Sequence, residues 1–280
     1  MSTRPLQVWM ITGCSSGFGY ELVKAALDAG HAVVATARSM ERLSDILIQY
    51  PDRCIGIPLD VKVPQQITSA VAQAQKRFGR IDVLVNNAGY GYLAAVEEGE
   101  DAAIRDIFET NYFGLAALIR AVLPQMRERR SGHIVNIGSV GGITGFIGVG
   151  YYCSTKFAVE GLSTTLAKEL APLGIKVTVV EPGPIRTEYY TRSAKMSPVR
   201  IAEYDDILPG RKGEAAFRAN PAGDPVRGAQ AVVKAVASEN PPLHLPLGKF
   251  AMDAARTKLA EMQRELDVWE AVAVATDFPE

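Results

Sequence analysis

Cysteine is scarce in this sequence: Cys14, Cys54 and Cys153 are the three cysteines among 280 residues. They form no Cys-x-x-Cys pair and no cluster with histidine at zinc-ligand spacing, so we expect neither a disulfide scaffold nor a bound metal. The N-terminus has no long apolar signal core, and no run of 18 consecutive apolar residues could form a transmembrane helix. The sequence therefore predicts a protein of the reducing cytoplasm that does not enter a membrane.

An excess of positive charge is also missing, because 30 Lys and Arg residues stand against 31 Asp and Glu residues, for a formal net charge of −1. The cluster Arg127, Arg129 and Arg130 falls at a predicted helix C-terminus, where cations are favourable, so we expect no nucleic-acid binding. Hydrophobic residues make up 48% of the chain, which suffices for a sizeable core and excludes disorder of the whole chain. No linker-like stretch divides it, so we predict a single domain over residues 1–280.

Short apolar runs alternate with amphipathic stretches to about residue 180, a pattern typical of βαβ units around a parallel sheet. It predicts an α/β fold, a Rossmann-type doubly wound sheet of seven parallel strands with helices on both faces. The strands are expected at Gln7–Ile11, Ala32–Thr36, Ile55–Pro58, Val83–Val85, His133–Ile137, Lys176–Val180 and Leu243–Pro246. Helices are expected near 18–29, 40–48, 64–77, 101–128, 151–171, 225–238 and 249–272.

The last third of the chain departs from this alternation. Residues 184–224 contain several prolines and glycines without a sustained period, so we expect a lid over a site rather than a core element. The segment 249–273 predicts a long helical extension with an apolar seam at alternating spacings of four and three. The seam consists of Ala255, Leu259, Met262, Leu266 and Trp269. We expect it to pack on its own domain, with an oligomer contact or a substrate-pocket wall as the alternative.

A glycine-rich turn connects the first predicted strand to the first predicted helix. Its glycines are Gly13, Gly17 and Gly19. Glycines there let the backbone approach a pyrophosphate, whose charge is stabilised by the unpaired N–H groups at the start of the helix. The turn predicts a dinucleotide site, with a sharp turn that binds nothing as the alternative.

Residues 13–17 also satisfy Gly-x-Ser-x-Gly, the nucleophile elbow of α/β hydrolases, with Ser15 as the nucleophile. That interpretation fits poorly, because an elbow needs an oxyanion-hole loop and several strands before it, and one strand precedes Ser15. The last histidine, His244, lies in an apolar strand-like run, where we expect a structural role. A serine hydrolase is therefore a distant alternative.

The position about twenty residues beyond the glycines indicates which cofactor binds. A cofactor without a 2′-phosphate needs an Asp or Glu there for its ribose hydroxyls, and this chain has Ala37-Arg38-Ser39. Arg38 can hold a 2′-phosphate through a forked, charge-assisted contact, helped by the hydroxyl of Ser15 or Ser16. The sequence thus favours NADP(H) over NAD(H), with a solvated arginine as the alternative.

Tyr152 and Lys156 stand four residues apart in a predicted helix, so their side chains share one face. Lowering the pKa of a phenol from about 10 to about 7 requires about 4 kcal/mol of preferential stabilisation of the phenolate. A nearby cation supplies about 1–3 pKa units, so Lys156 together with an oxidised nicotinamide ring would suffice. Tyr151 has Thr155 four residues on, and is the weaker candidate. Taken alone, Tyr152 and Lys156 could also be a packing pair.

Two further strands place polar groups at the same edge of the predicted sheet. Ser139 follows His133–Ile137 at its carboxyl end, the edge where open α/β sheets bind ligands. Its hydroxyl could hydrogen-bond a substrate carbonyl, or cap a helix. The strand Val83–Val85 ends in Asn86-Asn87-Ala88-Gly89, which could line the same site or form a simple turn.

Taken together, these motifs resemble the short-chain dehydrogenase/reductase family. The matching residues run in family order from residue 7 to about 187: Thr12-Gly13 with Gly17 and Gly19, Leu59-Asp60-Val61, Asn86-Asn87-Ala88-Gly89, Asn111 in Asn-Tyr-Phe-Gly, Ser139, Tyr152-x-x-x-Lys156, and Pro182-Gly183-Pro184-Ile185-x-Thr187. The resemblance implies hydride transfer between a nicotinamide ring and a carbonyl or alcohol carbon, for which the protein supplies orientation and a proton.

The resemblance also implies a role for each matching residue. Tyr152 would be the general acid, Lys156 would lower its pKa and hold the nicotinamide ribose, and Ser139 would orient the substrate oxygen. Asn111 would hold a water that links Lys156 to solvent. The cofactor would be lined by Gly13, Ser15, Ser16, Gly17, Phe18 and Gly19 at the phosphates, Arg38, Asp60 and Val61 at the adenosine, Asn87, Ala88 and Gly89 along its length, and Pro182, Gly183, Ile185 and Thr187 at the nicotinamide.

The sequence and the resemblance together predict an NADP(H)-dependent carbonyl reductase or alcohol dehydrogenase with a small-molecule substrate. A protein that senses the NADP(H) redox state without turnover is the alternative. The lid segment supplies apolar and aromatic side chains that suit a bulky, hydrophobic carbonyl compound: Tyr189, Tyr190, Met196, Tyr204, Ile207, Leu208 and Phe217. The resemblance further implies a homodimer or homotetramer.

Overall fold

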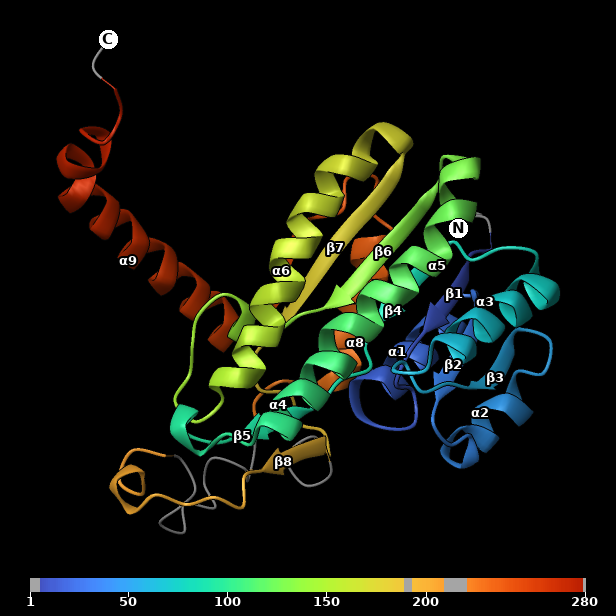
Figure 1. The fold of residues 1–280 in the computed structure, drawn as a ribbon. Coiled ribbons are helices and arrows are strands. Elements are labelled where there is room, and N and C mark those ends of the chain that lie inside the picture. Colours follow the sequence, from blue (N-terminus) through green and yellow to red (C-terminus); the bar gives the residue numbers. More distant parts are fainter. Residues whose placement is uncertain (1–5, 189–192, 209–220, 279–280) are drawn as a thin grey trace.

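A parallel seven-stranded sheet forms the centre of the protein, which we describe from a computed structural model for residues 6–188, 193–208 and 221–278. The strand order is β3-β2-β1-β4-β6-β7-β9 (Figure 1). The bounds are β1 Val8–Ile11, β2 Ala32–Ala37, β3 Cys54–Pro58, β4 Val83–Asn86, β6 Gly132–Ile137, β7 Ile175–Pro182 and β9 His244–Leu247. The predicted α/β fold with seven parallel strands is confirmed.

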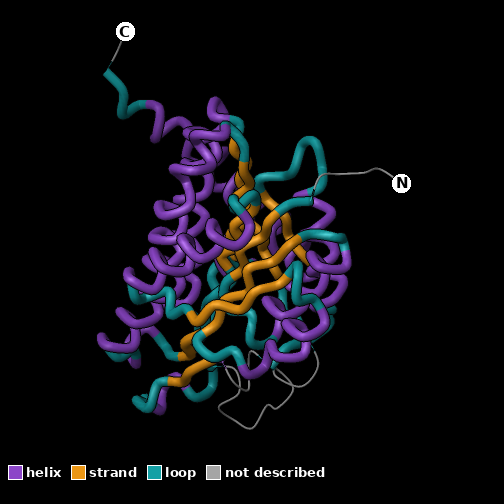
Figure 2. The backbone as a smooth tube through the Cα atoms, turned by 90° about the vertical axis from the view of Figure 1, so that its right-hand side faces the viewer, coloured by secondary structure: helices purple, strands orange, loops and turns teal. Residues whose placement is uncertain are grey.

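Helices cover both faces of this sheet (Figure 2). One face packs against α3 (Pro64–Phe78), α5 (Gly114–Arg129) and α6 (Gly150–Leu170), and the other against α1 (Gly17–Asp28), α2 (Ser44–Gln49) and α8 (Pro225–Val236). Successive side chains of a strand point to opposite faces. In β1, Val8 and Met10 therefore join the first core, whereas Trp9 and Ile11 join the second. Burial on both sides explains the nearly continuous apolar runs in the strands.

The strand order reverses at β1, which has β2 on one side and β4 on the other. The chain builds β1, β2 and β3 outward in one direction and then returns to place β4 and β6 on the other side. At such a reversal the loops after neighbouring strands diverge and leave a crevice at the carboxyl ends. The fold therefore opens a site beside the turn that follows β1.

The predicted helix 101–128 is not uniform, and this prediction needs correction. The chain forms α4 (Asp101–Phe108), a π-helical turn over Glu109–Phe113, and then α5. A π-helical turn inserts about one residue into the helix and often occurs at functional sites. The hydrophobic period did not reveal it, because one inserted residue barely disturbs a pattern of apolar positions. Asn111 lies within this turn.

Part of the predicted lid is an ordered layer. Its strand β8 (Ala194–Met196) pairs in parallel with β5 (Gly91–Leu93), a small sheet that the sequence did not predict. Ser197 after β8 donates a hydrogen bond from its hydroxyl to the carbonyl of Glu98, at 2.6 Å. The predicted lid residues Tyr189, Tyr190 and Phe217 lie outside the described residues.

The C-terminal helix α9 (Lys249–Val274) forms where predicted, but its seam does not pack on the domain. Ala251 is the buried residue of this helix, whereas Leu259, Leu266 and Trp269 are 66%, 63% and 59% exposed. Figure 1 shows α9 projecting away from the body. The expectation that the seam packs on the domain was wrong, because the spacing of apolar residues identifies an apolar helix face but does not tell which surface covers that face.

Among the described residues no helix is both long and apolar enough to span a membrane.

Candidate active site

The turn between β1 and α1 requires glycine at two positions. Gly13 has φ +70°, which side chains rarely adopt, and a Cβ atom there would lie 2.9 Å from the Cα atom of Ala88. At Gly19, a Cβ atom would collide with the side-chain amide of Asn87 and the carbonyl of Gly13. The turn therefore packs tightly against the end of β4, with no room for a side chain at these two positions.

Thr12 and Asn87 hold this turn against the end of β4. The Thr12 hydroxyl accepts hydrogen bonds from the backbone N–H groups of Asn87 and Ala88, each at 2.9 Å. The Asn87 amide in return donates to the carbonyl of Thr12 at 2.8 Å. No role was predicted for Thr12 itself, although its place directly before Gly13 was a signal.

The turn fits a dinucleotide. Residues 13 and 15–19 line one cavity, and the N-cap side chain of α1, Ser16, makes no capping hydrogen bond within the described chain. The first N–H groups of a helix without such a cap bind phosphate well, since the helix dipole adds positive potential there. The pyrophosphate would therefore be held by the backbone of residues 13–19.

A cavity of about 840 Å³ extends from this turn along the carboxyl ends of the strands. Its wall contains every residue predicted to bind the cofactor: Gly13, Ser15, Ser16, Gly17, Phe18, Gly19, Arg38, Asp60, Val61, Asn87, Ala88, Gly89, Tyr152, Lys156, Pro182, Gly183, Ile185 and Thr187. Ser139 lies on the same wall, whereas Asn111 is not part of it. The fold thus brings these residues together from six strand ends, the start of α1 and helix α6.

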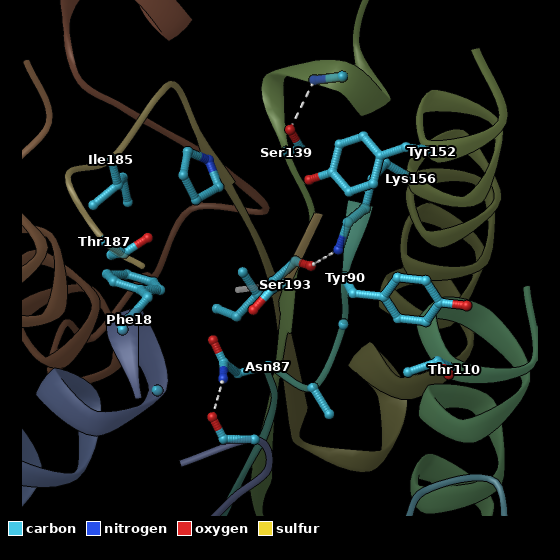
Figure 3. Close-up of a pocket in the computed structure, with 18 of the residues that line it drawn as sticks. Phe18, Asn87, Tyr90, Thr110, Ser139, Tyr152, Lys156, Ile185, Thr187 and Ser193 are labelled. Atoms are coloured by element: carbon cyan, nitrogen blue, oxygen red, sulfur yellow. Dashed lines mark hydrogen bonds between the residues drawn. The ribbon is translucent and has the colours of Figure 1, made fainter. Parts of the chain in front are cut away.

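Tyr152, Lys156 and Ser139 lie close together at the middle of the cavity (Figure 3). The ammonium of Lys156 lies 5.7 Å from the centre of the Tyr152 ring. The Ser139 hydroxyl accepts a hydrogen bond from the backbone N–H of Gly141 at 3.0 Å, which leaves its own hydrogen to be donated. In Figure 3 the Tyr152 hydroxyl points toward Ser139. A carbonyl oxygen between these two hydroxyls could accept from both.

Burial controls the charge of Lys156. The side chain is buried, and its Nζ atom donates to the carbonyl of Ile137 at 2.7 Å. Burial lowers the pKa of Lys156 to about 8, against the opposing effect of Glu160 one turn further along α6. The amine therefore still carries its charge at neutral pH, but holds its proton more weakly than a lysine in water.

A cluster of two glutamates and a histidine lies near Lys156, with one glutamate a helical turn further along α6. Glu160 of α6, Glu181 of β7 and His244 of β9 place their polar atoms within 4.8 Å of one another. Glu181 is fully buried, and its carboxyl group is hydrogen-bonded to Nδ1 of His244 at 2.7 Å. Burial, and then the neighbouring Glu181, raise the pKa of Glu160 to about 8, so Glu160 holds its proton at neutral pH. The spacing of Glu160 from Lys156 could have signalled this contact.

Asn111 is anchored by the protein itself. Its amide donates to the carbonyl of Tyr90 at 3.0 Å and to the hydroxyl of Thr155 at 3.1 Å, and its oxygen accepts from the N–H of Tyr90 at 3.0 Å. The π-helical turn aims the side chain at α6, where Thr155 directly precedes Lys156. In this arrangement both amide hydrogens are directed to protein acceptors, and Asn111 ties the π-helical turn to the helix that carries Tyr152 and Lys156.

Arg38 and Lys62 place two cations at one end of the cavity. Both line it, and Arg38 follows β2 without a neighbouring carboxylate in the sequence. The hydrogen bond with Asp106 raises the pKa of Lys62, whereas the positive charge of Arg38 works against its protonation. The two cations are therefore near neighbours.

Asp106 joins this end of the cavity to β8, in the segment predicted to be a lid. Its carboxylate accepts from Lys62 at 2.8 Å, from the Tyr90 hydroxyl at 2.6 Å and from Lys195 of β8 at 3.2 Å. These contacts, the one to Lys62 first, hold the pKa of Asp106 well below its usual range. The sequence offered no signal for this contact, because its members come from four separate segments.

Among the described residues, the lid side chains that were expected to supply the apolar part of the cavity wall do not line it. The described residues Met196, Tyr204, Ile207 and Leu208 are not part of the wall, and β8 and its preceding residue contribute Ser193 and Lys195. Apolar side chains of the wall that lie outside residues 184–224 include Leu93, Val140, Phe146, Ile147, Val149 and Phe250. The ring centres of Phe146 and Phe250 lie 5.8 Å apart, although more than a hundred residues separate the two in the chain.

The sequence matches the family described as "short chain dehydrogenase" over residues 7–197. It is 37% identical over 264 residues to "Retinol dehydrogenase 8" of Homo sapiens, a match that covers 87% of this chain and 81% of that protein.

Two solved structures show the same fold at high coverage. A short-chain dehydrogenase from Streptomyces avermitilis is 44% identical, with a TM-score of 0.91, and the match covers 99% of this chain and 100% of the other. A short chain dehydrogenase from Burkholderia cenocepacia in complex with NADP is 26% identical, with a TM-score of 0.73, and the match covers 94% and 96%.

Proposed function

The chain belongs to the short-chain dehydrogenase family, and from this premise we propose that it is an NADP(H)-dependent reductase of bulky, hydrophobic carbonyl compounds. It is an oxidoreductase of CH–OH donors, of a family that uses nicotinamide cofactors. One observation carries the proposal. Tyr152, Lys156 and Ser139 share a cavity wall with the glycine turn, so a proton donor and a hydride donor would face the same carbonyl.

The proposed reaction uses each of these side chains for one task. The cofactor supplies the hydride. Ser139 donates a hydrogen bond to the carbonyl oxygen, and Tyr152 transfers its phenolic proton to that oxygen as negative charge develops there. The buried ammonium of Lys156 stabilises the phenolate that remains, because a cation in a partly desolvated site lowers the pKa of a nearby phenol. Asn111 holds the helix in register through Thr155.

The preference for NADP(H) rests on charge at the adenosine end. Arg38 and Lys62 line the cavity there, and no carboxylate stands at residues 37–39 to bind ribose hydroxyls or repel a phosphate. A guanidinium binds phosphate through two parallel hydrogen bonds.

The proposed substrate class rests on the apolar wall beside Tyr152. Phe146, Ile147 and Phe250 offer a surface that a small polar sugar could not use, whereas an aryl or polycyclic ketone would bury apolar area against it. A similar human protein is named for retinol, a large apolar alcohol.

The test is oxidation of NADPH and NADH, followed at 340 nm over a panel of aryl ketones, apolar aldehydes and small sugars. We expect turnover with NADPH and higher kcat/KM for apolar carbonyls. Better turnover with NADH, or with sugars, would contradict the cofactor or the substrate assignment. Tight NADPH binding without turnover of any carbonyl would instead support a redox sensor.

A further inference from the structure

Helix α9 begins at the active site and ends far from the body. Phe250 lines the cavity, and the backbone N–H of Ala251 lies beside Gly183. From Arg256 onward, the apolar positions of the helix are exposed to solvent (Figure 1). The exposed part, residues 256–274, is about 28 Å long at the rise of an α-helix. A helix of this length is not stabilised by its own hydrogen bonds alone, and an apolar face usually packs on a partner.

The exposed face carries a regular seam at the spacing of a coiled coil. Counting Met252, its members are three and then four residues apart in alternation: Met252, Ala255, Leu259, Met262, Leu266 and Trp269. Met262 is 47% exposed, and Leu259, Leu266 and Trp269 are more exposed still. A repeat of 3.5 residues keeps one seam facing a second helix. The seam therefore fits another helix better than a flat protein surface.

We propose that α9 pairs antiparallel with α9 of a second copy of this chain. The charges beside the seam carry this assignment. Lys258 and Glu265 lie on one flank, directly before Leu259 and Leu266. In an antiparallel pair related by a two-fold axis, each flank of the helix faces the same flank of the partner helix. The residues of the two flanks then run in opposite directions. Lys258 then meets the partner's Glu265, and the symmetry makes this contact twice.

The parallel arrangement is disfavoured by the same residues. There, each flank faces the opposite flank of the partner one turn further on. Glu265 would face the partner's Glu270, a contact between like charges. The antiparallel register that joins Lys258 and Glu265 also places Leu259 against the partner's Met262, and Leu266 against the partner's Ala255. In the second of these contacts a large side chain meets a small one.

A membrane surface is a poor occupant for this face. Helix α9 contains four basic and five acidic residues, a net charge of −1, and its acidic residues lie on both flanks. A helix that binds in the plane of an anionic membrane is typically rich in Lys and Arg on its polar face. Positive and negative side chains are interspersed along α9. They suit a partner helix that carries the same charges in the opposite order, as a second, antiparallel α9 does.

Charge reversal in the full-length protein tests the arrangement, with the dissociation constant measured by sedimentation velocity. Lys258→Glu and Glu265→Lys should each raise that constant about fivefold or more, because two attractive contacts become repulsive. The double variant K258E/E265K should return it to within about twofold of the wild type. A wild-type chain that stays monomeric at 100 μM, or three variants that associate like the wild type, would overturn the proposal. Tighter association of E265K would show a parallel pair instead.

Disulfide cross-linking separates this contact from any other interface of the protein. The three native cysteines are buried, so introduced thiols on α9 would react alone. The double variant L259C/M262C should form a covalent dimer on mild oxidation, whereas Thr257→Cys, on the opposite face of α9, should not. Equal yields, or no covalent dimer, would contradict the pairing. Neither measurement depends on turnover, so the proposed function and this inference can fail separately.

Discussion

Lys156 lies one helical turn beyond Tyr152 on α6, with its ammonium 5.7 Å from the centre of the tyrosine ring. The lysine is fixed from behind, because its Nζ atom donates to the carbonyl of Ile137 at the end of β6. A fixed, buried cation can stabilise a phenolate without first reorganising. The helical spacing and the end of one strand thus jointly set the proposed proton donor.

Replacing Tyr152 with phenylalanine removes that donor. We expect kcat for carbonyl reduction to fall by about 10²–10⁴-fold, the usual contribution of a general acid, while the dissociation constant for NADPH changes little. Tyr151→Phe is the matched control, since the Tyr151 hydroxyl donates to the carbonyl of Val96. Steady-state assays at 340 nm and fluorescence titration of NADPH measure both quantities. Near-normal kcat in the Tyr152 variant would refute the mechanism.

Arg38→Asp should reverse the preference between cofactors. The substitution removes the cation that would hold a 2′-phosphate and introduces a carboxylate that can accept from ribose hydroxyls. We expect the ratio of kcat/KM for NADPH to that for NADH to fall at least about tenfold. Arg77→Asp makes the same charge change on α3, outside the cavity wall, and should leave the ratio unchanged. An unchanged ratio in the Arg38 variant would contradict the assignment.

The fold and the main site residues could be predicted because they depend on local patterns. Strand and helix periods alternate, and the motif residues follow strand ends, which all meet at one edge of a parallel sheet. The contacts of Asp106 could not be predicted, because Lys62 and Lys195 approach it only after folding. The same holds for α9, whose seam was visible while its surroundings were not.

Glu98 shows how the described part of the lid is attached to the body. It is fully buried, and its carboxylate accepts from the backbone N–H groups of Ala95 at 3.0 Å and Ile201 at 2.7 Å. Glu98→Gln would leave one of these N–H groups facing an amide donor. We expect the free energy of unfolding to fall by about 1–3 kcal/mol, the cost of an unsatisfied buried group.

Glu97→Gln is the control for this change. Glu97 accepts from the Tyr204 hydroxyl at an exposed position, and its substitution should change the free energy of unfolding by no more than about 0.5 kcal/mol. Urea unfolding of both variants and the wild type measures the difference. Equal losses in the two variants would show that Glu98 does not anchor the lid.

A methyl group at Gly19 should disturb the glycine turn from within. It would collide with the Asn87 amide and the carbonyl of Gly13, both of which hold the turn. We expect Gly19→Ala to lower the free energy of unfolding by about 1–3 kcal/mol, as overpacking does, and to weaken NADPH binding. Gly161→Ala places the same methyl group on α6, where nothing lies within 4 Å, and should stabilise the helix by about 0.5–1 kcal/mol. Intact NADPH binding by the Gly19 variant would contradict the assigned cradle.

His133 should make the protein sensitive to mild acid. The side chain is buried in β6, and burial lowers its pKa to about 4. The Thr178 hydroxyl donates to the carbonyl of Pro242, so it accepts from Nε2 of His133, which fixes the neutral imidazole with its proton on that nitrogen. Between pH 6.5 and 4, the unfolded chain therefore binds a proton that the folded protein does not.

The sign follows from this difference in bound protons. Because the unfolded state binds more protons, the free energy of unfolding rises with pH across this window. The contribution of His133 to that free energy is therefore lost as the pH falls from 6.5 to about 4. A shift from 6.5 to about 4 corresponds to about 3 kcal/mol at most. His133→Gln can still donate to Thr178 but does not titrate. Urea unfolding at pH 7.0 and 4.5 should show the wild type losing about 2–3 kcal/mol more than the variant, and equal losses would show that His133 is protonated in the folded protein.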